Sequence, residues 1–546
     1  MDMVTDMKSN LSPKKISPYV LLLLTFSTAT IAQQANVPGS VSAGSDIGAS
    51  QGDATGGRAW TIRPRVTLTE TLTDNANVNQ SGRQTDLITE ISPGIRIDMR
   101  TARLKGYFDY ALSGQFYARS DYSRTQNSLN TFGTLEAIDN WFFVDFSGRI
   151  AQQAISAFGP QSASNTTINS NSAETSSYRV SPYIRGQLLT GAVNYSLRYN
   201  YTTTSSDAVA SSDTTLSQWI GQLQGGTPFQ QLKWTLDANQ QTADYSRGRK
   251  TDSDLYRMML TYTLLPQFRV SLSGGWEANN YASVQTKGKT THGYGFDWSP
   301  TPRTQLTAFR ERRFFGDGHD ITFTHRFPLS SIRFTDNRNI SVFPDQFGVT
   351  GRGTLYDFYY QQLSNSEPYA SISDPATKNT VVDAAVNLLL AATGRDPNTQ
   401  VVSSFLSSQA TVQRRQQLAF TLQGVRNSLT LMATRGESQA LMSTTGISDD
   451  FTKNSLNSIE QRGVSLNITH RLSEITNMSF LASRQESTGS GSTNNIKTTT
   501  TTYQVNVSTK LGAKTTGSLS ARRSEFDSST SPYTENALVG MLNYTY

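Results

Sequence analysis

Arginine is the residue type in this chain with the clearest capacity for chemistry. After residue 32 the sequence holds about 35 arginines against about 10 lysines. The planar guanidinium pairs bidentately with carboxylate or phosphate and keeps its charge, so arginines that ring the inner wall of a pore favour anions. We expect seven arginines on polar strand faces to line such a pore: Arg63, Arg65, Arg96, Arg149, Arg198, Arg257 and Arg269.

The same arginines have a second role that is compatible with the first. Carboxylates recur on the polar faces of the same segments, and an arginine–carboxylate pair between strands stiffens a wall instead of selecting ions. The candidate partners are Glu70, Glu90, Asp98, Asp109, Asp145 and Asp237. The sequence leaves both roles open.

Residues for catalysis or metal binding do not occur at usable spacing. The chain has no cysteine and four histidines, so it has no thiolate nucleophile and no cysteine cluster. His319 and His325 lie on one expected strand, ~20 Å apart at about 3.3 Å per residue, too far to share a metal. Gly288–Thr290 resembles the end of a phosphate loop, but Ser283 replaces the required first glycine. We expect no catalytic, cofactor-binding or metal site and no enzyme, and keep an embedded hydrolase as a third hypothesis only.

The elements that must position these side chains are strands of about ten residues in which apolar and polar residues alternate. Period-two alternation shows one face of a strand to lipid and the other to a polar lumen, and its recurrence from Trp60 to Tyr546 is typical of a transmembrane β-barrel. No internal run of about 18 apolar residues exists, which excludes a helical membrane protein. One clear example has its apolar face at Leu104, Gly106, Phe108, Tyr110, Leu112 and Phe116, and its polar face at Lys105, Asp109, Ser113 and Gln115.

We therefore predict an all-β fold over residues 59–546: a single closed antiparallel transmembrane β-barrel of about 22 strands, within a range of 16–24. Short connections such as Ile138–Trp141 alternate with long ones such as Gln152–Glu174. Bacterial barrels have short periplasmic turns and long external loops, so both ends of the barrel chain are expected on the periplasmic side. The segments Thr214–Gly225 and Thr304–Phe315 alternate poorly.

Two segments precede the strands. Residues 1–32 contain Lys14 and Lys15, an apolar stretch and the small residues of Thr30–Ala32, which together predict a secretory signal peptide. Residues 33–58 are rich in Gly, Ser, Ala and Gln without periodicity, and we expect a disordered periplasmic segment there.

Residues 343–410 interrupt the strand pattern as an extracellular insert. Asp374-Pro375 suits a helix start, apolar residues then recur at three-to-four spacing, and Gly394 suits the helix end. One or two short helices are expected, in a loop subdomain that covers the barrel mouth or in a constriction folded into the lumen. Asp449 and Asp450, in a later external loop, could contact calcium, but we expect a solvated acidic pair.

Two stretches carry a family resemblance: Thr69–Asn75 (TETLTDN) and Asp86–Gly94 (DLITEISPG). Together with the chain length, the leader and the terminal aromatic residue, they resemble the PEP-CTERM-system-associated outer-membrane protein family. The resemblance implies an outer-membrane barrel found with exopolysaccharide biosynthesis and export systems, and it transfers no catalytic residue. The terminal Leu542, Tyr544 and Tyr546 resemble the signal that the barrel-assembly machinery reads.

Two functional hypotheses from different classes follow, both in the cell outer membrane. The first is a porin-like pore or export conduit associated with exopolysaccharide or PEP-CTERM secretion. The second is a non-conducting scaffold whose loops bind polysaccharide or secreted protein. Expected partners are outer-membrane lipid, the barrel-assembly machinery, and exopolysaccharide or periplasmic export components. A small charge excess and the lack of basic runs argue against nucleic acid.

Overall fold

The computed structural model describes residues 59–208, 212–342, 382, 386, 405–407, 409–441, 450–454, 456–491 and 495–546. These residues form one sheet of 22 strands. The strands are β1 (Trp60–Thr73), β2 (Asp86–Arg100), β3 (Leu104–Tyr117), β4 (Ser123–Ile138), β5 (Phe142–Ala154), β6 (Ser172–Leu188), β7 (Val193–Ser206), β8 (Thr214–Gly226), β9 (Leu232–Tyr245), β10 (Thr251–Leu265), β11 (Phe268–Asn279), β12 (Lys287–Thr301), β13 (Thr304–Arg313), β14 (Gly316–Arg326), β15 (Ser330–Ser341), β16 (Thr411–Gln423), β17 (Asn427–Ala440), β18 (Leu456–Arg471), β19 (Thr476–Gly491), β20 (Asn495–Lys510), β21 (Thr515–Ser528) and β22 (Tyr533–Thr545). Two short helices accompany them, η2 (Leu189–Gly191) and α3 (Asp450–Lys453).

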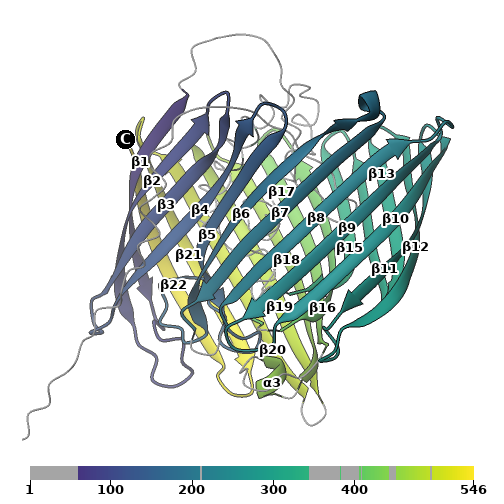
Figure 1. Ribbon diagram of the computed structural model, residues 1–546. Helices are drawn as coiled ribbons and strands as arrows, with labels where there is room; N and C mark the ends of the chain where they lie inside the picture. Colours follow the sequence, from purple (N-terminus) through teal and green to yellow (C-terminus); the bar gives the residue numbers. More distant parts are fainter. Residues whose placement is uncertain are drawn as a thin grey trace, which may run out of the picture.

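The sheet closes on itself. Each strand runs antiparallel to its neighbours in the chain, and β22 pairs with β1, so that Leu542 lies opposite Leu68 and Tyr544 opposite Val66 (Figure 1). Past the last paired residue the N–H of Tyr546 donates to the carbonyl of Pro64 at 2.9 Å. Closure leaves no sheet edge, and in hydrocarbon each unpaired backbone group costs several kcal/mol.

The two faces of the wall differ as the alternation predicts. On β1 the side chains of Ile62 and Leu68 are 58% and 38% exposed, whereas Thr71 and Thr73 on the other face are 2% and 1% exposed. The first set points outward as the apolar band of a transmembrane barrel, and the second points into the lumen. A closed 22-stranded barrel with such a band belongs in the bacterial outer membrane.

The two rims differ in their connections, as expected. Long connections such as 74–85 and 155–171 lie at one rim, and tight turns such as the one in which Phe327 donates to Ser330 at 2.7 Å lie at the other. The barrel chain begins and ends at the short-turn rim, which is the upper rim in Figure 1. One connection departs from the rule, because Phe314-Phe315 alone joins β13 to β14 at the loop rim.

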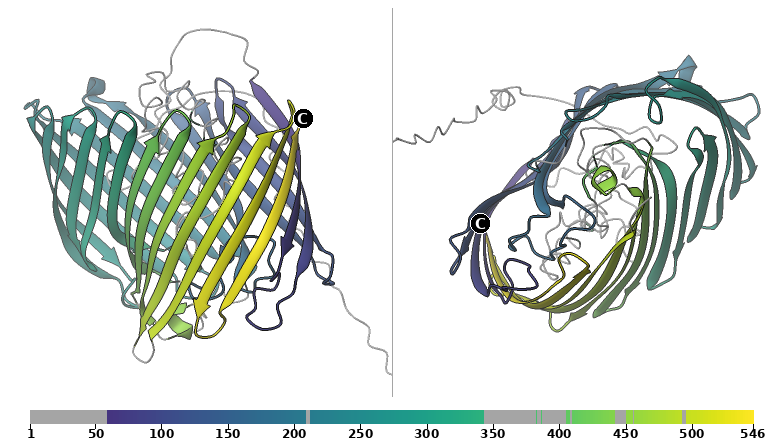
Figure 2. Two further views of the ribbon diagram at one scale, coloured as in Figure 1. Left: turned by 180° about the vertical axis from the view of Figure 1, so that it is seen from behind. Right: turned by 90° about the horizontal axis from the view of Figure 1, so that it is seen from below.

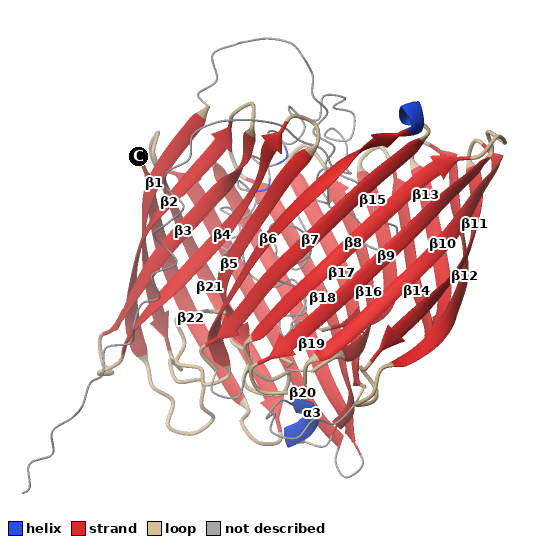
Figure 3. Ribbon diagram, viewed as in Figure 1, coloured by secondary structure: helices blue, strands red, loops and turns tan. Residues whose placement is uncertain are grey.

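The predicted closed barrel is confirmed, including both segments that alternate poorly, which form β8 and β13. Strands dominate the described chain (Figure 3). Residues 1–58 lie outside the described residues, as does most of the 343–410 insert, so the signal peptide, the disordered segment and the insert stay predictions. Val382 and Val386 are helical and fully buried. Among the described residues no helix is long and apolar enough to span a membrane.

Several strands extend farther at the loop rim than the sequence pattern indicates. The alternation ends near Ser487, but β19 continues to Gly491, and β20 starts at Asn495 instead of Thr500. Apart from Ile496, the residues of these extensions are polar or glycine on both faces. A strand that projects beyond the hydrocarbon layer meets water on both sides, so period-two patterning no longer marks it.

Candidate functional site

All seven arginines singled out from the sequence lie on the luminal face of the wall. Arg63 and Arg65, for example, alternate along β1 with the outward Ile62 and Val66. Their exposure differs: the side chain of Arg63 is 49% exposed and that of Arg257 is 10% exposed. Whether they line an open pore depends on what closes the lumen.

Across β1, β2 and β3, three of these arginines interleave with two aspartates. Asp98 accepts from Arg63 and, at 3.2 Å, from Arg96. Asp109 accepts from Arg65 at 2.6 Å and lies 3.6 Å from Arg96. Each aspartate therefore bridges two arginines, and the network joins three adjacent strands.

A further ion pair links two strands that are not adjacent in the sheet. Arg198 on β7 pairs with Asp145 on β5 at 2.8 Å, and its guanidinium lies 4.1 Å from the ring centroid of Tyr183 on the intervening β6. Stacking on an aromatic face stabilises a guanidinium in this position.

Arg257 on β10 pairs with Asp237 on β9 at 3.1 Å and with Glu311 on β13 at 3.4 Å. The three side chains are 10%, 11% and 6% exposed, so this is the most enclosed of these luminal networks. Arg269 on β11 lies 3.4 Å from Asp297 on β12 and is 53% exposed.

The expected carboxylate partners are thus only partly right. Asp98, Asp109, Asp145 and Asp237 pair with arginine, but Glu70 lies on the outward face and accepts from Thr89. Glu90 is luminal and accepts from Gln115 at 2.8 Å. Glu70 was assigned to the luminal face because it is charged. Its position on the strand, two residues from both Leu68 and Leu72, puts it on the outward face.

Pairing changes what the arginines can do. A guanidinium held by a carboxylate contributes little net charge to the lumen, so the anion preference expected from arginine alone is reduced. Small and amide side chains supply much of the remaining wall. Buried luminal examples are Thr71, Gln115, Ser177, Ser181, Thr202 and Gln222. These side chains make the remaining wall polar and largely uncharged.

The lumen narrows at the loop rim because the loop at 155–171 folds inward. It reaches from β5 past β4 and β3, where Gln126 donates to the carbonyl of Asn165 at 3.0 Å and Tyr117 to that of Thr166. Farther on, Ile168 donates to the carbonyl of Ala76 in the β1–β2 connection at 2.8 Å. The view from the loop side shows inward-folded connections and α3 within the mouth (Figure 2).

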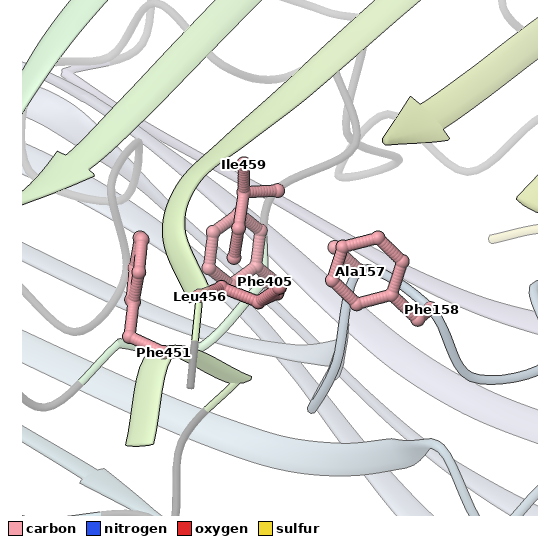
Figure 4. Close-up of a cluster of buried hydrophobic side chains, with 6 residues drawn as sticks. All are labelled: Ala157, Phe158, Phe405, Phe451, Leu456 and Ile459. Atoms are coloured by element: carbon pink, nitrogen blue, oxygen red, sulfur yellow. The ribbon is translucent and has the colours of Figure 1, made fainter. Parts of the chain in front are cut away.

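Three external connections meet over the lumen in one apolar cluster, which we call the cap cluster (Figure 4). Its members are Ala157, Phe158, Phe405, Phe451, Leu456 and Ile459. They come from the β5–β6 loop, from the end of the 343–410 segment, and from the β17–β18 region. Phe405 is 1% exposed, and its ring centroid lies 6.2 Å from that of Phe451. The cluster therefore joins loops from separate parts of the wall.

A carboxylate locks the same junction. Asp450, at the first position of α3, accepts from the hydroxyl of Ser156 at 2.6 Å and from the N–H of Ala157 at 2.8 Å. It is 5% exposed, so the expectation of a solvated acidic residue is wrong at this position. No sequence periodicity marks these loops, and the contact joins residues almost 300 positions apart, so local patterns could not reveal it.

The described ends of the 343–410 segment also pack on the inner wall. Val342 and Ala410 lie in one buried cluster with Leu216 of β8, Tyr245 of β9 and Tyr281 of the β11–β12 loop. Burial raises the pKa of Tyr281 to about 12. The segment thus enters and leaves along the lumen side of the rim.

The three residues expected to form the assembly signal lie at the short-turn rim on the outward face. Leu542, Tyr544 and Tyr546 are 44%, 38% and 62% exposed. The two tyrosine rings meet edge to face at a centroid distance of 4.8 Å. This placement leaves the side chains accessible, and their recognition by the assembly machinery stays a prediction.

Comparison with known proteins gives a likeness among solved structures only. No protein-family model and no curated protein match the sequence. The FrpB iron transporter from Neisseria meningitidis (F3-3 variant) is 9% identical, with a TM-score of 0.47 over 89% of this chain and 81% of that one. The siderophore receptor PirA from Acinetobacter baumannii is 7% identical, with a TM-score of 0.48 over 89% and 80%. FpvA from Pseudomonas aeruginosa, in complex with pyoverdine and iron, is 7% identical, with a TM-score of 0.47 over 89% and 72%.

Proposed function

We propose that this barrel is a gated outer-membrane conduit whose external loops close it at rest. The observation that carries the proposal is the cap cluster, in which three connections from separate parts of the wall meet over the lumen. The wall is a continuous hydrogen-bonded sheet, whereas the cap is held by the cap cluster, by the hydrogen bonds of Asp450 and by a few contacts of its loops with the wall, such as the bridge between Ala154 and Phe405. Such a cap separates without disturbing the barrel.

The proposed cargo is an exopolysaccharide or a secreted protein of the PEP-CTERM type. A barrel of this strand number encloses a lumen wide enough for a polymer chain once its loops move aside. Hydroxyl and amide side chains on the wall offer exchangeable hydrogen bonds, and the paired arginines avoid trapping an ionic cargo. The family resemblance of Thr69–Asn75 and Asp86–Gly94 supports this context.

A second candidate function is a closed scaffold whose loops bind polysaccharide or protein at the cell surface. Burial at both junctions of the 343–410 segment favours it, because Val342, just before the segment, and Ala410, its last residue, are 2% and 6% exposed against the inner wall. If the whole segment packs in this way, the lumen stays filled and nothing passes.

Single-channel conductance in planar bilayers separates the two functions. The conduit predicts resting closure with discrete openings, and a large ohmic conductance after deletion of residues 343–410. The scaffold predicts no openings in either protein. Asp139→Ala is a matched control, since Asp139 is 64% exposed in a short-turn connection where it pairs with Arg103, and neither function predicts a change. A silent deletion variant that still shows heat-modifiable gel mobility would refute the conduit.

A further inference from the structure

A row of basic side chains crosses the outward face of the barrel near the loop rim. Strand register places Arg310 of β13 opposite His319 of β14, His319 opposite Arg338 of β15, and Arg338 opposite Arg414 of β16. With about 4.8 Å between neighbouring strands, the row spans about 14 Å. We call these four residues the outward basic row.

The row lies on the lipid side of the wall and not in the lumen. Arg310 shares its strand face with Leu306 and Ala308, and its cross-strand partner on β12 is Tyr294, which is 58% exposed. Arg414 shares its face with Leu418, which is 46% exposed. Residues two apart on a strand share one face of the sheet, and residues directly opposite each other on neighbouring strands do too. The whole row therefore points outward.

Its height matches the boundary of the apolar band on the side of the loop rim. From the short-turn rim towards the loop rim, the outward positions of β13 to β16 are mainly apolar until Ala308, Ile321, Phe334 and Leu418. The next outward positions on these strands are charged or polar. In a bilayer this boundary is where the head groups of the outer leaflet meet the protein.

The aspartates of this patch leave it positive. Asp317 accepts from Arg310 at 2.6 Å and from Arg312 at 3.1 Å. Asp336, with a side chain 7% exposed, accepts from Arg414 at 2.7 Å and from His319 at 2.9 Å. Asp336 also accepts a hydrogen bond from the side-chain amide of Gln416 at 2.9 Å. Arg338 donates to the main-chain carbonyl of Asp317 at 2.5 Å.

Four arginines therefore stand against three carboxylates: Asp317, Asp336 and Glu437, which lies opposite Arg414 on β17. Arg338 donates to a main-chain oxygen and not to a carboxylate, yet it lies directly opposite Arg414. Like charges directly opposite each other on neighbouring strands repel. An anion seated between the two guanidinium groups would relieve that repulsion and form charge-assisted hydrogen bonds with both.

The surface beside the row is hollowed. A cleft of about 400 Å³ lies over β12 to β16. Phe296, Ala308 and Ile321 line its apolar part, and Arg310, Arg338 and Arg414 line its charged part. The apolar part is on the side of the membrane interior and the charged part is on the side of the loop rim, which is the polarity of a lipid.

We propose that the outward basic row and this cleft bind the phosphate-bearing head group of an outer-leaflet lipid, with an acyl chain along the apolar part. The site is separate from the lumen and does not depend on the proposed conduit. A guanidinium group binds two phosphate oxygens at once, which the ammonium group of lysine cannot do. A site built from arginine instead of lysine therefore suits a phosphate group.

Binding of a bisphosphorylated diglucosamine lipid to the full chain in detergent, followed by native mass spectrometry, tests the proposal. The acyl-matched lipid without phosphates and inorganic phosphate are the two comparison ligands. We expect the double variant Arg338→Gln/Arg414→Gln to bind the phosphorylated lipid roughly 30-fold more weakly, since each arginine near an anionic surface contributes about a factor of five.

The matched control is Arg435→Gln/Arg462→Gln. These two outward arginines also lie directly opposite each other, on β17 and β18, but each of them is paired with a carboxylate, since Glu460 accepts from both. We expect the control to bind the phosphorylated lipid as the wild type does. Heat-modifiable gel mobility verifies that both variants form the closed barrel.

Three results would overturn the proposal. The first is equal binding of the lipids with and without phosphates, which needs only the wild-type protein. The second is unchanged binding in the folded Arg338→Gln/Arg414→Gln variant. The third is an affinity for inorganic phosphate equal to that for the phosphorylated lipid, which would make the patch a general anion site.

Discussion

The barrel wall is held together by far more contacts than its external cap. Every strand of the wall pairs with two neighbours along its length, and luminal ion pairs such as Arg257–Asp237 join strands again from the inside. The cap instead depends on the cap cluster, the hydrogen bonds of Asp450 and scattered loop contacts such as the bridge between Ala154 and Phe405. The wall can therefore stay intact while the cap opens, and this difference in connection is the physical basis of a gate.

Truncation of Phe405, the most buried phenylalanine of the cap cluster, is expected to have the greatest effect. Phe405→Ala removes a fully buried ring from the junction of three loops, and such truncations destabilise packing by about 3–5 kcal/mol. We expect more than a hundredfold rise in the open-to-closed ratio, measured as single-channel open time, without a change in the heat-modifiable gel shift. Phe229→Ala, at a 71% exposed phenylalanine of the short-turn rim, is the matched control. If both variants open equally rarely, the cap does not gate.

Loss of the carboxylate at the same junction ranks second. Asp450→Ala leaves the N–H of Ala157 and the hydroxyl of Ser156 without this acceptor, and an unsatisfied buried donor costs about 2 kcal/mol. The open-to-closed ratio should rise about 30-fold. Asp450→Asn keeps one acceptor oxygen and should fall between the wild type and the alanine variant in open time. A silent Asp450→Ala variant would remove Asp450 from the gate.

A break in the wall should change selectivity and stability but leave gating alone. Arg257→Gln leaves Asp237 and Glu311 without their shared partner, and with water in the lumen we expect a loss of about 2 kcal/mol. The temperature of the gel-mobility shift should fall, and reversal potentials should move towards cations. More frequent opening of this variant would show that wall and cap are coupled.

The smallest effect is expected at an exposed wall pair. Arg63 is 49% exposed beside Asp98, which Arg96 also contacts, so Arg63→Gln should lower stability by less than about 1 kcal/mol. A slight shift in reversal potential towards cations is expected, with the gel-shift temperature unchanged. A selectivity change larger than that of Arg257→Gln would mean that exposed arginines, and not the enclosed networks, set the lumen potential.

The sequence predicts the wall well and the cap poorly. Period-two patterning marks a strand wherever one face meets lipid. The pattern is weak in β8 and β13 but was still enough to locate both strands. It fails where both faces meet water, as in the extension of β19 to Gly491. The luminal position of the seven arginines follows from the same parity.

The cap could not be predicted because its contacts join loops without periodicity. Nothing local connects Ser156 to Asp450, or Phe158 to Phe405, and these pairs meet only after the barrel has closed. The outward basic row could not be predicted for a related reason. Each of the four strands contributes one basic residue, which alone indicates no site, and the four come together only through the register of β13 to β16.

A reversible lock on the cap tests the central claim most directly. The chain has no cysteine, and Ala154 and Phe405 are bridge partners in neighbouring backbone segments, within the reach of a disulfide. In the variant Ala154→Cys/Phe405→Cys, we predict no channel openings when the disulfide is formed and frequent openings after reduction, because the reduced cap has lost its central ring. Single-cysteine variants should not respond to reduction. Identical traces from the oxidised and reduced double variant would contradict the account.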